Sequence, residues 1–153
     1  MSVIHHSAIC ASDVEESLRF WRDGLGFDVL MDERFTGDWP TLLRAPSTSL
    51  RSVFLGRAGE GDSGIVELVD LGLEAGRGAT TDPVGHGFLL LSIMTDVDAA
   101  LERLAGLGLG GAPRVIETHG ITMATVTDPD GVVVELIGTA AIERLGASTD
   151  SVT

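Results

Sequence analysis

Four amino acids are missing from this chain: lysine, asparagine, glutamine and tyrosine do not occur among its 153 residues. The absence of lysine and tyrosine excludes a Schiff-base lysine and a catalytic tyrosine. Cysteine occurs once, as Cys10. A single cysteine excludes an internal disulfide and a zinc site made of cysteines alone, and it fits a reducing compartment. We therefore predict a cytoplasmic location.

Positive charge and long apolar segments are also scarce. Ten arginines stand against 23 acidic residues, which gives a formal net charge of −13. Such a surface repels phosphates and anionic membranes, so we expect neither nucleic acid nor membrane as a partner. No apolar run approaches the ~18 residues of a membrane helix, and the first ten residues lack the basic region of a signal peptide. A soluble, single-chain globular domain is the class that remains.

The chain contains an internal repeat. An apolar segment followed by a pair of N-cap residues occurs twice, as Val3–Cys10 with Ser12-Asp13 and as Phe88–Met94 with Thr95-Asp96. After each cap, apolar residues at i, i+4 and i+7 predict an amphipathic helix. These residues are Val14, Leu18 and Trp21 in the first half, and Val97, Leu101 and Leu104 in the second. Both helices are expected to end at a Gly-Leu-Gly sequence.

Three strands are predicted after each helix. They cover residues 27–34, 50–56 and 65–70 in the first half, and 113–117, 121–127 and 132–137 in the second. Asp128–Gly131 is a turn, because proline presets φ and glycine accepts a positive φ.

The predicted architecture is therefore an α+β fold of two βαβββ modules that form a cup-shaped mixed sheet. Module 1 covers 1–70, a linker 71–85, module 2 86–138, and a frayed tail 139–153. One helix cannot cover both faces of a four-stranded sheet, so we expect the two modules to share one core as a single domain, 1–153.

Acidic and imidazole side chains inside apolar strands are the candidates for chemistry, since their burial is costly unless they are paired or bound to metal. His6 lies in the first strand and His86 opens the fifth, while Glu67 and Glu135 occupy the last strand of each half. The repeat makes the two glutamates equivalent. One imidazole and two carboxylates suit Ni²⁺, Zn²⁺, Mn²⁺ or Fe²⁺.

The strand pattern also restricts which side chains face a site. A single glutamate on an alternating strand usually faces solvent, but Glu135 shares its face with Val133 and Ile137. The neighbours His5 and His6 are expected to point to opposite faces, so that at most one of them lines the site.

The ends of the repeat resemble a known family. Ile4–Ile9, Ser17–Trp21 and Leu25–Phe27 are similar to the opening of the vicinal oxygen chelate superfamily, and Thr127–Leu136 is similar to its last hairpin. This group includes glyoxalase I, methylmalonyl-CoA epimerase, extradiol dioxygenases and the fosfomycin and bleomycin resistance proteins. The resemblance covers nearly the whole chain and implies the two-module fold.

The resemblance also implies a set of metal ligands. The first-strand, fourth-strand and last-strand ligands match His6, Glu67 and Glu135. The fifth-strand ligand, usually histidine, falls on Leu89 when the repeat is applied, and the nearest imidazole is His86, three residues earlier. Three alternatives follow: His86 is recruited by a shift in register, the site has three protein ligands, or the metal has been lost.

The implied function is that of a metal-assisted lyase or isomerase acting on a substrate with vicinal oxygens. The metal would act as a Lewis acid, and a carboxylate would move a proton between adjacent carbons. Glu67 and Glu135 are the candidate bases, with Glu135 preferred. An extradiol-type dioxygenase, the third choice, would need His6 and His86 with Glu135 around Fe²⁺.

The alternative from a different class is a metal-free binding protein of the drug-sequestering type. Trp39, Phe54 or Phe88 would stack on a flat ligand, and His119 is a further candidate for ligand binding. The acidic balance suits a cationic or neutral ligand. In either case we expect a homodimer, because open sheets leave edges and apolar faces that a second chain can cover.

Overall fold

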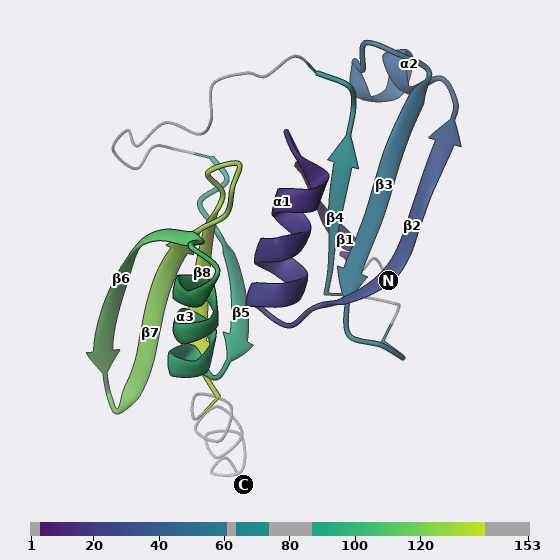
Figure 1. Ribbon diagram of the computed structural model, residues 1–153. Helices are drawn as coiled ribbons and strands as arrows, with labels where there is room; N and C mark the ends of the chain where they lie inside the picture. Colours follow the sequence, from purple (N-terminus) through teal and green to yellow (C-terminus); the bar gives the residue numbers. More distant parts are fainter. Residues whose placement is uncertain (1–3, 61–63, 74–86, 140–153) are drawn as a thin grey trace, which may run out of the picture. The chain divides into compact units, whose positions relative to one another are not determined.

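The computed structural model describes residues 4–60, 64–73 and 87–139. The chain divides into two compact units, Met1–Ala79 (unit 1) and Thr80–Thr153 (unit 2), and each contains a four-stranded sheet (Figure 1). The boundary falls inside the segment predicted as a linker. That one core is shared between the halves stays a prediction, and residues 140–153 of the predicted tail lie outside the described residues.

Unit 1 has one helical layer on a mixed sheet. Its elements are β1 (His6–Cys10), α1 (Val14–Leu18), a π-helical continuation (Arg19–Gly24), β2 (Asp28–Thr36), α2 (Trp39–Leu43), β3 (Ser49–Gly56) and β4 (Ile65–Asp70). The strand order is β1-β4-β3-β2, with β1 parallel to β4 and the other pairs antiparallel.

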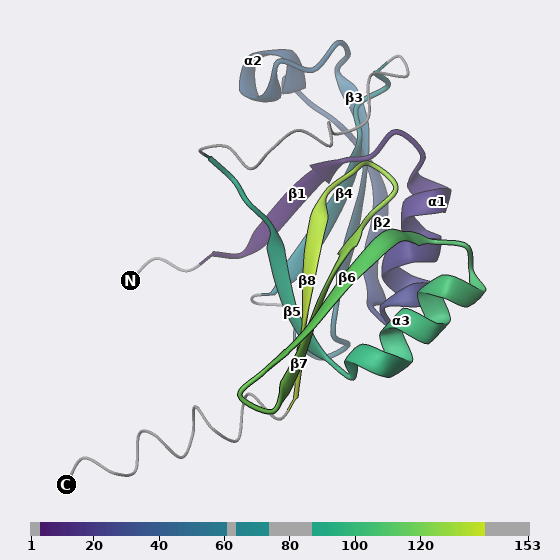
Figure 2. The same cartoon turned by 90° about the vertical axis from the view of Figure 1, so that its left-hand side faces the viewer.

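Unit 2 repeats this topology. It consists of β5 (Leu91–Thr95), α3 (Val97–Gly106), β6 (Gly110–Thr118), β7 (Ile121–Thr127) and β8 (Val133–Gly138). The order is β5-β8-β7-β6, again with the first strand parallel to the last, and α3 lies along one face of the sheet (Figure 2). The predicted α+β class and the βαβββ repeat are therefore confirmed.

The first turns of the helices follow from their caps. The Asp13 carboxylate accepts hydrogen bonds from the backbone N–H groups of Glu15 and Glu16, and Asp96 accepts one from Ala99. These bonds satisfy donors that have no partner within a helix. The buried face of α3 is Val97, Ala100 and Leu104, whereas the predicted Leu101 is half-buried.

Two helical features were not predicted. The π-helical turn has a wider spacing than an α-helix and buries the neighbours Phe20 and Trp21 completely, with their rings 5.3 Å apart in an edge-on arrangement. Helix α2 lies at the end of the β2–β3 pair (Figure 1) and begins after an Asp38 cap. Trp39 is the first residue of this helix.

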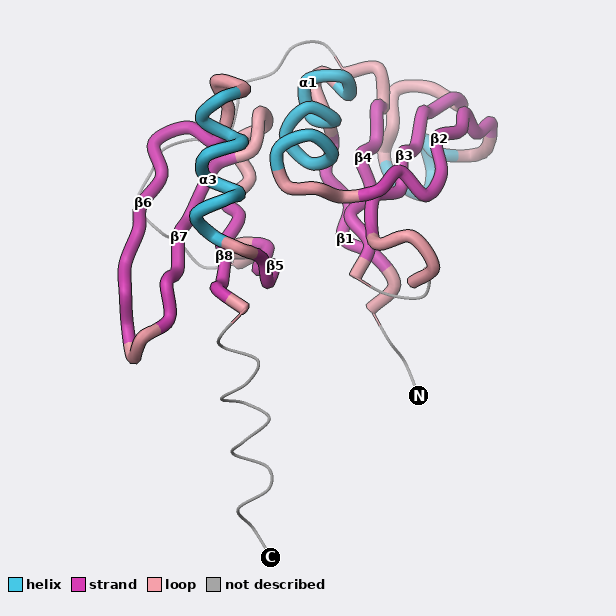
Figure 3. The backbone as a smooth tube through the Cα atoms, turned by 60° about the horizontal axis from the view of Figure 1, so that its bottom comes forward, coloured by secondary structure: helices cyan, strands magenta, loops and turns pink. Residues whose placement is uncertain are grey.

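Each sheet has a helix face and an opposite face. In unit 1, Arg51 of β3 reaches Glu15 of α1, so Val53 and Leu55, on the same side of β3, face the helix. Their neighbours on β3 and β4, Ser52 and Glu67 among them, therefore lie on the other face. The tube view in Figure 3 shows a helix on one side of each sheet.

Arg51 of β3 forms two ion pairs, one with α1 and one with β2. Arg51 Nε and Nη2 donate to Asp32 of β2 at 2.9 and 2.8 Å, and Nη1 donates to Glu15 at 2.9 Å. The hydrogen bonds from Arg51 lower the pKa of the Asp32 carboxyl below its ordinary value. Asp32 therefore stabilises the fold most at neutral pH.

We expect Asp32→Asn to lower the free energy of unfolding by about 1 kcal/mol at pH 7, since the carboxylate is partly exposed and screened by water. Because the pKa is lower in the folded state, the stability is present above the unfolded pKa and is lost as the pH falls. In urea titrations the difference from wild type should begin to shrink near pH 4 and vanish only below the lowered pKa of the folded state. Glu33→Gln, which removes the same charge from the other face of β2, is the control; an equal loss there would contradict the assignment.

Candidate functional site

A histidine and a glutamate meet on the face of the unit 1 sheet opposite α1. The parallel register pairs Ala8 with Glu67, which puts His6, two residues before Ala8, on the same face. His6 Nε2 lies 3.1 Å from Glu67 Oε2, and Ser52 Oγ donates to Glu67 Oε1 at 2.5 Å. Both carboxylate oxygens of Glu67 are thus engaged.

Two aromatic rings extend this cluster. His5 Nδ1 lies 2.9 Å from His6 Nδ1, and the Phe54 ring lies 5.9 and 5.4 Å from the two imidazoles. The expectation that His5 and His6 point to opposite faces was wrong, because β1 begins at His6 and the strand alternation does not extend to His5. With Glu67 ionised and His6 neutral, His6 Nε2–H donates to Glu67 and His6 Nδ1 accepts from His5.

The second glutamate is held differently. Glu135 of β8 pairs with Ser92 of β5, and Ser92 Oγ donates to Glu135 Oε2 at 2.8 Å. Among the described residues, Glu135 Oε1 forms no hydrogen bond. Thr125 of β7 lies beside Glu135 on the face away from α3, the side that corresponds to that of Glu67 in unit 1. One oxygen of Glu135 is anchored and the other is open.

The sheet register corrects the expected equivalences within the repeat. Ala8 pairs with Glu67 and Ser92 pairs with Glu135, so the counterpart of His6 is Leu90 rather than Leu89. The helix caps pointed to Leu89 because Ser92 lies one residue closer to the Asp96 cap than Ala8 lies to the Asp13 cap. His86 lies outside the described residues.

Metal ligands were tested against this geometry. No group of three or more histidine, cysteine, aspartate or glutamate side chains that could hold a metal ion occurs in the described parts of the chain. In unit 1, His6 lies beside Glu67, but both carboxylate oxygens of Glu67 already have partners. In unit 2, the position that corresponds to His6 is Leu90, which cannot bind a metal beside Glu135. Within each unit the described donors do not fit a metal centre, and the convergence of Glu135 with His6 and Glu67 stays a prediction.

The predicted ligand-binding residues lie in different surroundings. Phe54 is half-buried beside the imidazoles, whereas Phe88 precedes β5 with 77% of its surface exposed. The indole N–H of Trp39 donates to the Phe35 carbonyl at 3.2 Å. His119 sits in the β6–β7 turn with a φ of 52°, next to the Thr118 hydroxyl. Of the four, Phe54 is the residue in contact with the His6 cluster.

Ser52, Ser92 and His5 were missed by the sequence analysis. A signal was present for Ser52, which precedes an apolar run in β3 and is 2% exposed, whereas Ser92 is exposed. A buried hydroxyl needs a hydrogen-bond partner, and the nearest polar group in the sheet is the glutamate. No such signal exists for His5, whose direction depends on where β1 begins.

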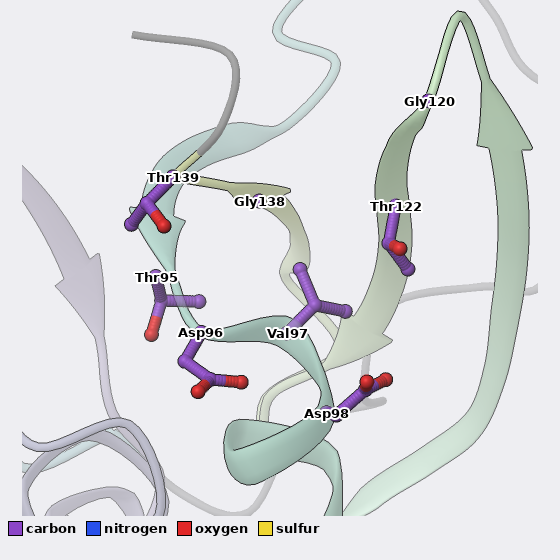
Figure 4. Close-up of a pocket in the computed structure, with 8 residues that line it drawn as sticks. All are labelled: Thr95, Asp96, Val97, Asp98, Gly120, Thr122, Gly138 and Thr139. Atoms are coloured by element: carbon purple, nitrogen blue, oxygen red, sulfur yellow. The ribbon is translucent and has the colours of Figure 1, made fainter. Parts of the chain in front are cut away.

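A separate pocket lies at the N-terminus of α3 (Figure 4). Asp96, Asp98 and Thr122 are among its lining residues. The Asp96 carboxylate is engaged in capping α3, and Glu135 is not part of the lining.

Comparison with known families agrees with this fold. The model of the Glyoxalase/Bleomycin resistance protein/Dioxygenase superfamily matches residues 3–136, so the chain belongs to this family. The resemblance seen in the sequence is confirmed.

Two curated relatives have names of the lyase type. The chain is 37% identical over 155 residues to the lactoylglutathione lyase-like protein terB of Aspergillus terreus, covering 94% of this chain and 78% of the relative. It is 26% identical to a probable lactoylglutathione lyase of Synechocystis, covering 89% and 95%.

Solved structures extend the comparison. The trypanothione-dependent glyoxalase I of Leishmania major has a TM-score of 0.66 at 21% identity, covering 97% of this chain and 95% of that one, which shows the fold. TnmS3, an antibiotic binding protein from Streptomyces, has a TM-score of 0.59 at 27% identity, covering 90% and 96%. None of the helices among the described residues is long and apolar enough to cross a membrane.

Proposed function

We propose that this chain is a glyoxalase-type lyase or isomerase that moves a proton between adjacent carbons of a substrate with vicinal oxygens. The observation that carries the proposal is the Glu135 carboxylate, which Ser92 anchors through one oxygen while the other has no hydrogen bond within the described residues. The family and the lyase-like names of its relatives support the same reaction class.

Glu135 is the base in this proposal. A C–H bond next to a substrate carbonyl breaks, its proton passes to Glu135 Oε1, and the electron pair moves into an enediolate. The same carboxyl group then returns the proton to the neighbouring carbon, which balances the reaction without an oxidant or reductant. Glu67 is less suited to this step because Ser52 and His6 engage both of its oxygens. No step is assigned to a divalent metal, because within each unit the described donors do not fit one.

The test is hydrogen exchange at carbon. The purified protein is incubated in D₂O with methylglyoxal and glutathione, and separately with dihydroxyacetone, and deuterium incorporation is followed by NMR. We expect protein-dependent deuterium incorporation into at least one of them. Exchange at the rate of the protein-free sample in both mixtures would contradict the proposal.

A binding protein is the second candidate, and the His5–His6–Phe54 cluster favours it. Three rings within 6 Å of one another form a surface on which a flat ligand can stack, and TnmS3 is described as an antibiotic binding protein. Calorimetric binding of a flat aromatic drug without turnover would support this function. Phe54→Ala should then weaken binding. No observation favours the dioxygenase.

We also propose a homodimer. Strand β6 is an edge of the unit 2 sheet, and its Val115 and Ile116 are 53% and 60% exposed. An exposed apolar edge strand favours pairing with a second chain. Light scattering is expected to give about twice the 16.0 kDa of one chain, and Val115→Arg to lower the mass. A monomer mass for wild type at all concentrations would contradict the proposal.

A further inference from the structure

The two units hold their glutamates with different residues at two corresponding positions. In unit 1, His6 engages Glu67 Oε2, and alanine, Ala8, stands directly beside Glu67 in the register. In unit 2 the residue directly beside Glu135 is Ser92, which donates to Oε2, and the position two residues earlier is Leu90. The pattern His-x-Ala has become Leu-x-Ser.

This exchange changes what the carboxylate can do. An imidazole is a ligand for Ni²⁺, Zn²⁺ and Fe²⁺, whereas a leucine side chain has no lone pair, and a neutral serine hydroxyl is rarely used for these ions. The serine hydroxyl instead donates its proton to the carboxylate, which satisfies one oxygen without a cation. Leu90 is half-buried and lies two residues before Ser92.

We infer that Leu90 and Ser92 together keep a divalent metal off Glu135, so that the chain has no resident metal and Glu135 works as a free carboxylate. In unit 2, Ser92 orients Glu135 as His6 orients Glu67 in unit 1. At Leu90, the counterpart of His6, there is no side-chain donor atom to bind a metal. The inference deepens the proposed role of Glu135. Only the statement that Glu135 works as a free carboxylate rests on the proposed function, because metal uptake is measured without turnover.

The experiment restores the unit 1 pattern in unit 2. Leu90→His/Ser92→Ala copies His6 and Ala8, and Leu90→His alone is the second variant. Leu89→His is the matched control, because it adds the same imidazole to the segment before β5 but not at the position that corresponds to His6. Each protein is checked for folding by circular dichroism. Metal content is then measured by mass spectrometry, and Zn²⁺ and Ni²⁺ affinity by titration and by thermal shift with and without EDTA.

We expect wild type and Leu89→His to purify without stoichiometric metal and to show no thermal shift with EDTA. Removing a residue that only hydrogen-bonds to a metal ligand lowers metal affinity about tenfold. Adding a ligand itself should therefore strengthen Zn²⁺ binding by at least about tenfold over the control. Wild type that carries one equivalent of metal and is destabilised by EDTA would overturn the inference. So would folded Leu90→His variants that bind Zn²⁺ no more tightly than Leu89→His. Absence of hydrogen exchange at carbon, in contrast, would count against the proposed reaction alone.

Discussion

Glu135→Gln is expected to lower turnover about a thousandfold, because general-base catalysis contributes about 10²- to 10⁴-fold and the amide cannot accept the substrate proton. The side chain keeps its size, and its carbonyl oxygen can still accept from Ser92. We therefore expect kcat to fall while substrate affinity and the melting temperature stay close to wild type. Steady-state kinetics and hydrogen exchange at carbon measure the effect.

Two matched variants distinguish the base from its surroundings. Ser92→Ala keeps the carboxylate and removes its anchor, so we expect a loss of only about tenfold, since an anchoring hydrogen bond to a charged group is worth roughly 1.5 kcal/mol. Glu67→Gln should act mainly on stability, because it disturbs the contacts with His6 and Ser52. If Glu67→Gln removes activity and Glu135→Gln does not, the two carboxylates have the reverse roles.

Phe20→Ala is expected to lower the free energy of unfolding by about 4 kcal/mol, a large part of the roughly 5–15 kcal/mol that holds a domain together. Phe20 is completely buried and packs edge-on against Trp21, which in turn packs against Phe27. Truncation leaves a cavity under the π-helical turn, where the backbone geometry prevents collapse. Urea unfolding followed by circular dichroism gives the value.

The control for this prediction is Phe35→Ala. Phe35 is 39% exposed on the edge strand β2, and its contact with Trp39 uses the backbone carbonyl, which the substitution retains. We expect a loss of less than about 1 kcal/mol. Equal losses for the two phenylalanines would mean that the π-helical turn is not the core of unit 1.

The regular features of the fold were predictable because they depend on short-range patterns. Asp13 and Asp96 cap their helices as expected, and the strands follow the predicted order with ends shifted by a few residues. The π-helical turn was not predictable, since Phe20 falls outside an i, i+4, i+7 face. Helix α2 was missed because five residues carry too little periodicity.

The candidate site was predictable only in part, because hydrogen-bond partners depend on register. His6 and Glu67 stood out as polar residues in apolar strands, and the structure brings them into contact. Their partner Ser52 lies on a different strand. The counterpart of His6 is Leu90 rather than the expected Leu89, because the spacing to the helix cap differs by one residue between the units. A single residue reverses the face of a strand position, so sequence spacing alone cannot settle such an assignment.

The parallel pairing of the first and last strands also has a consequence for the order of folding. β1 leaves the ribosome first, yet its partner β4 is the last strand of unit 1 to be made. The β2–β3 hairpin joins neighbours in sequence and can form early, whereas β1 must wait until a loop of more than 50 residues closes between His6 and Ile65. Contact between His6 and Glu67 is therefore expected to form at the end of this process. Because all of these strands precede unit 2, that contact can be complete before β5 is synthesised.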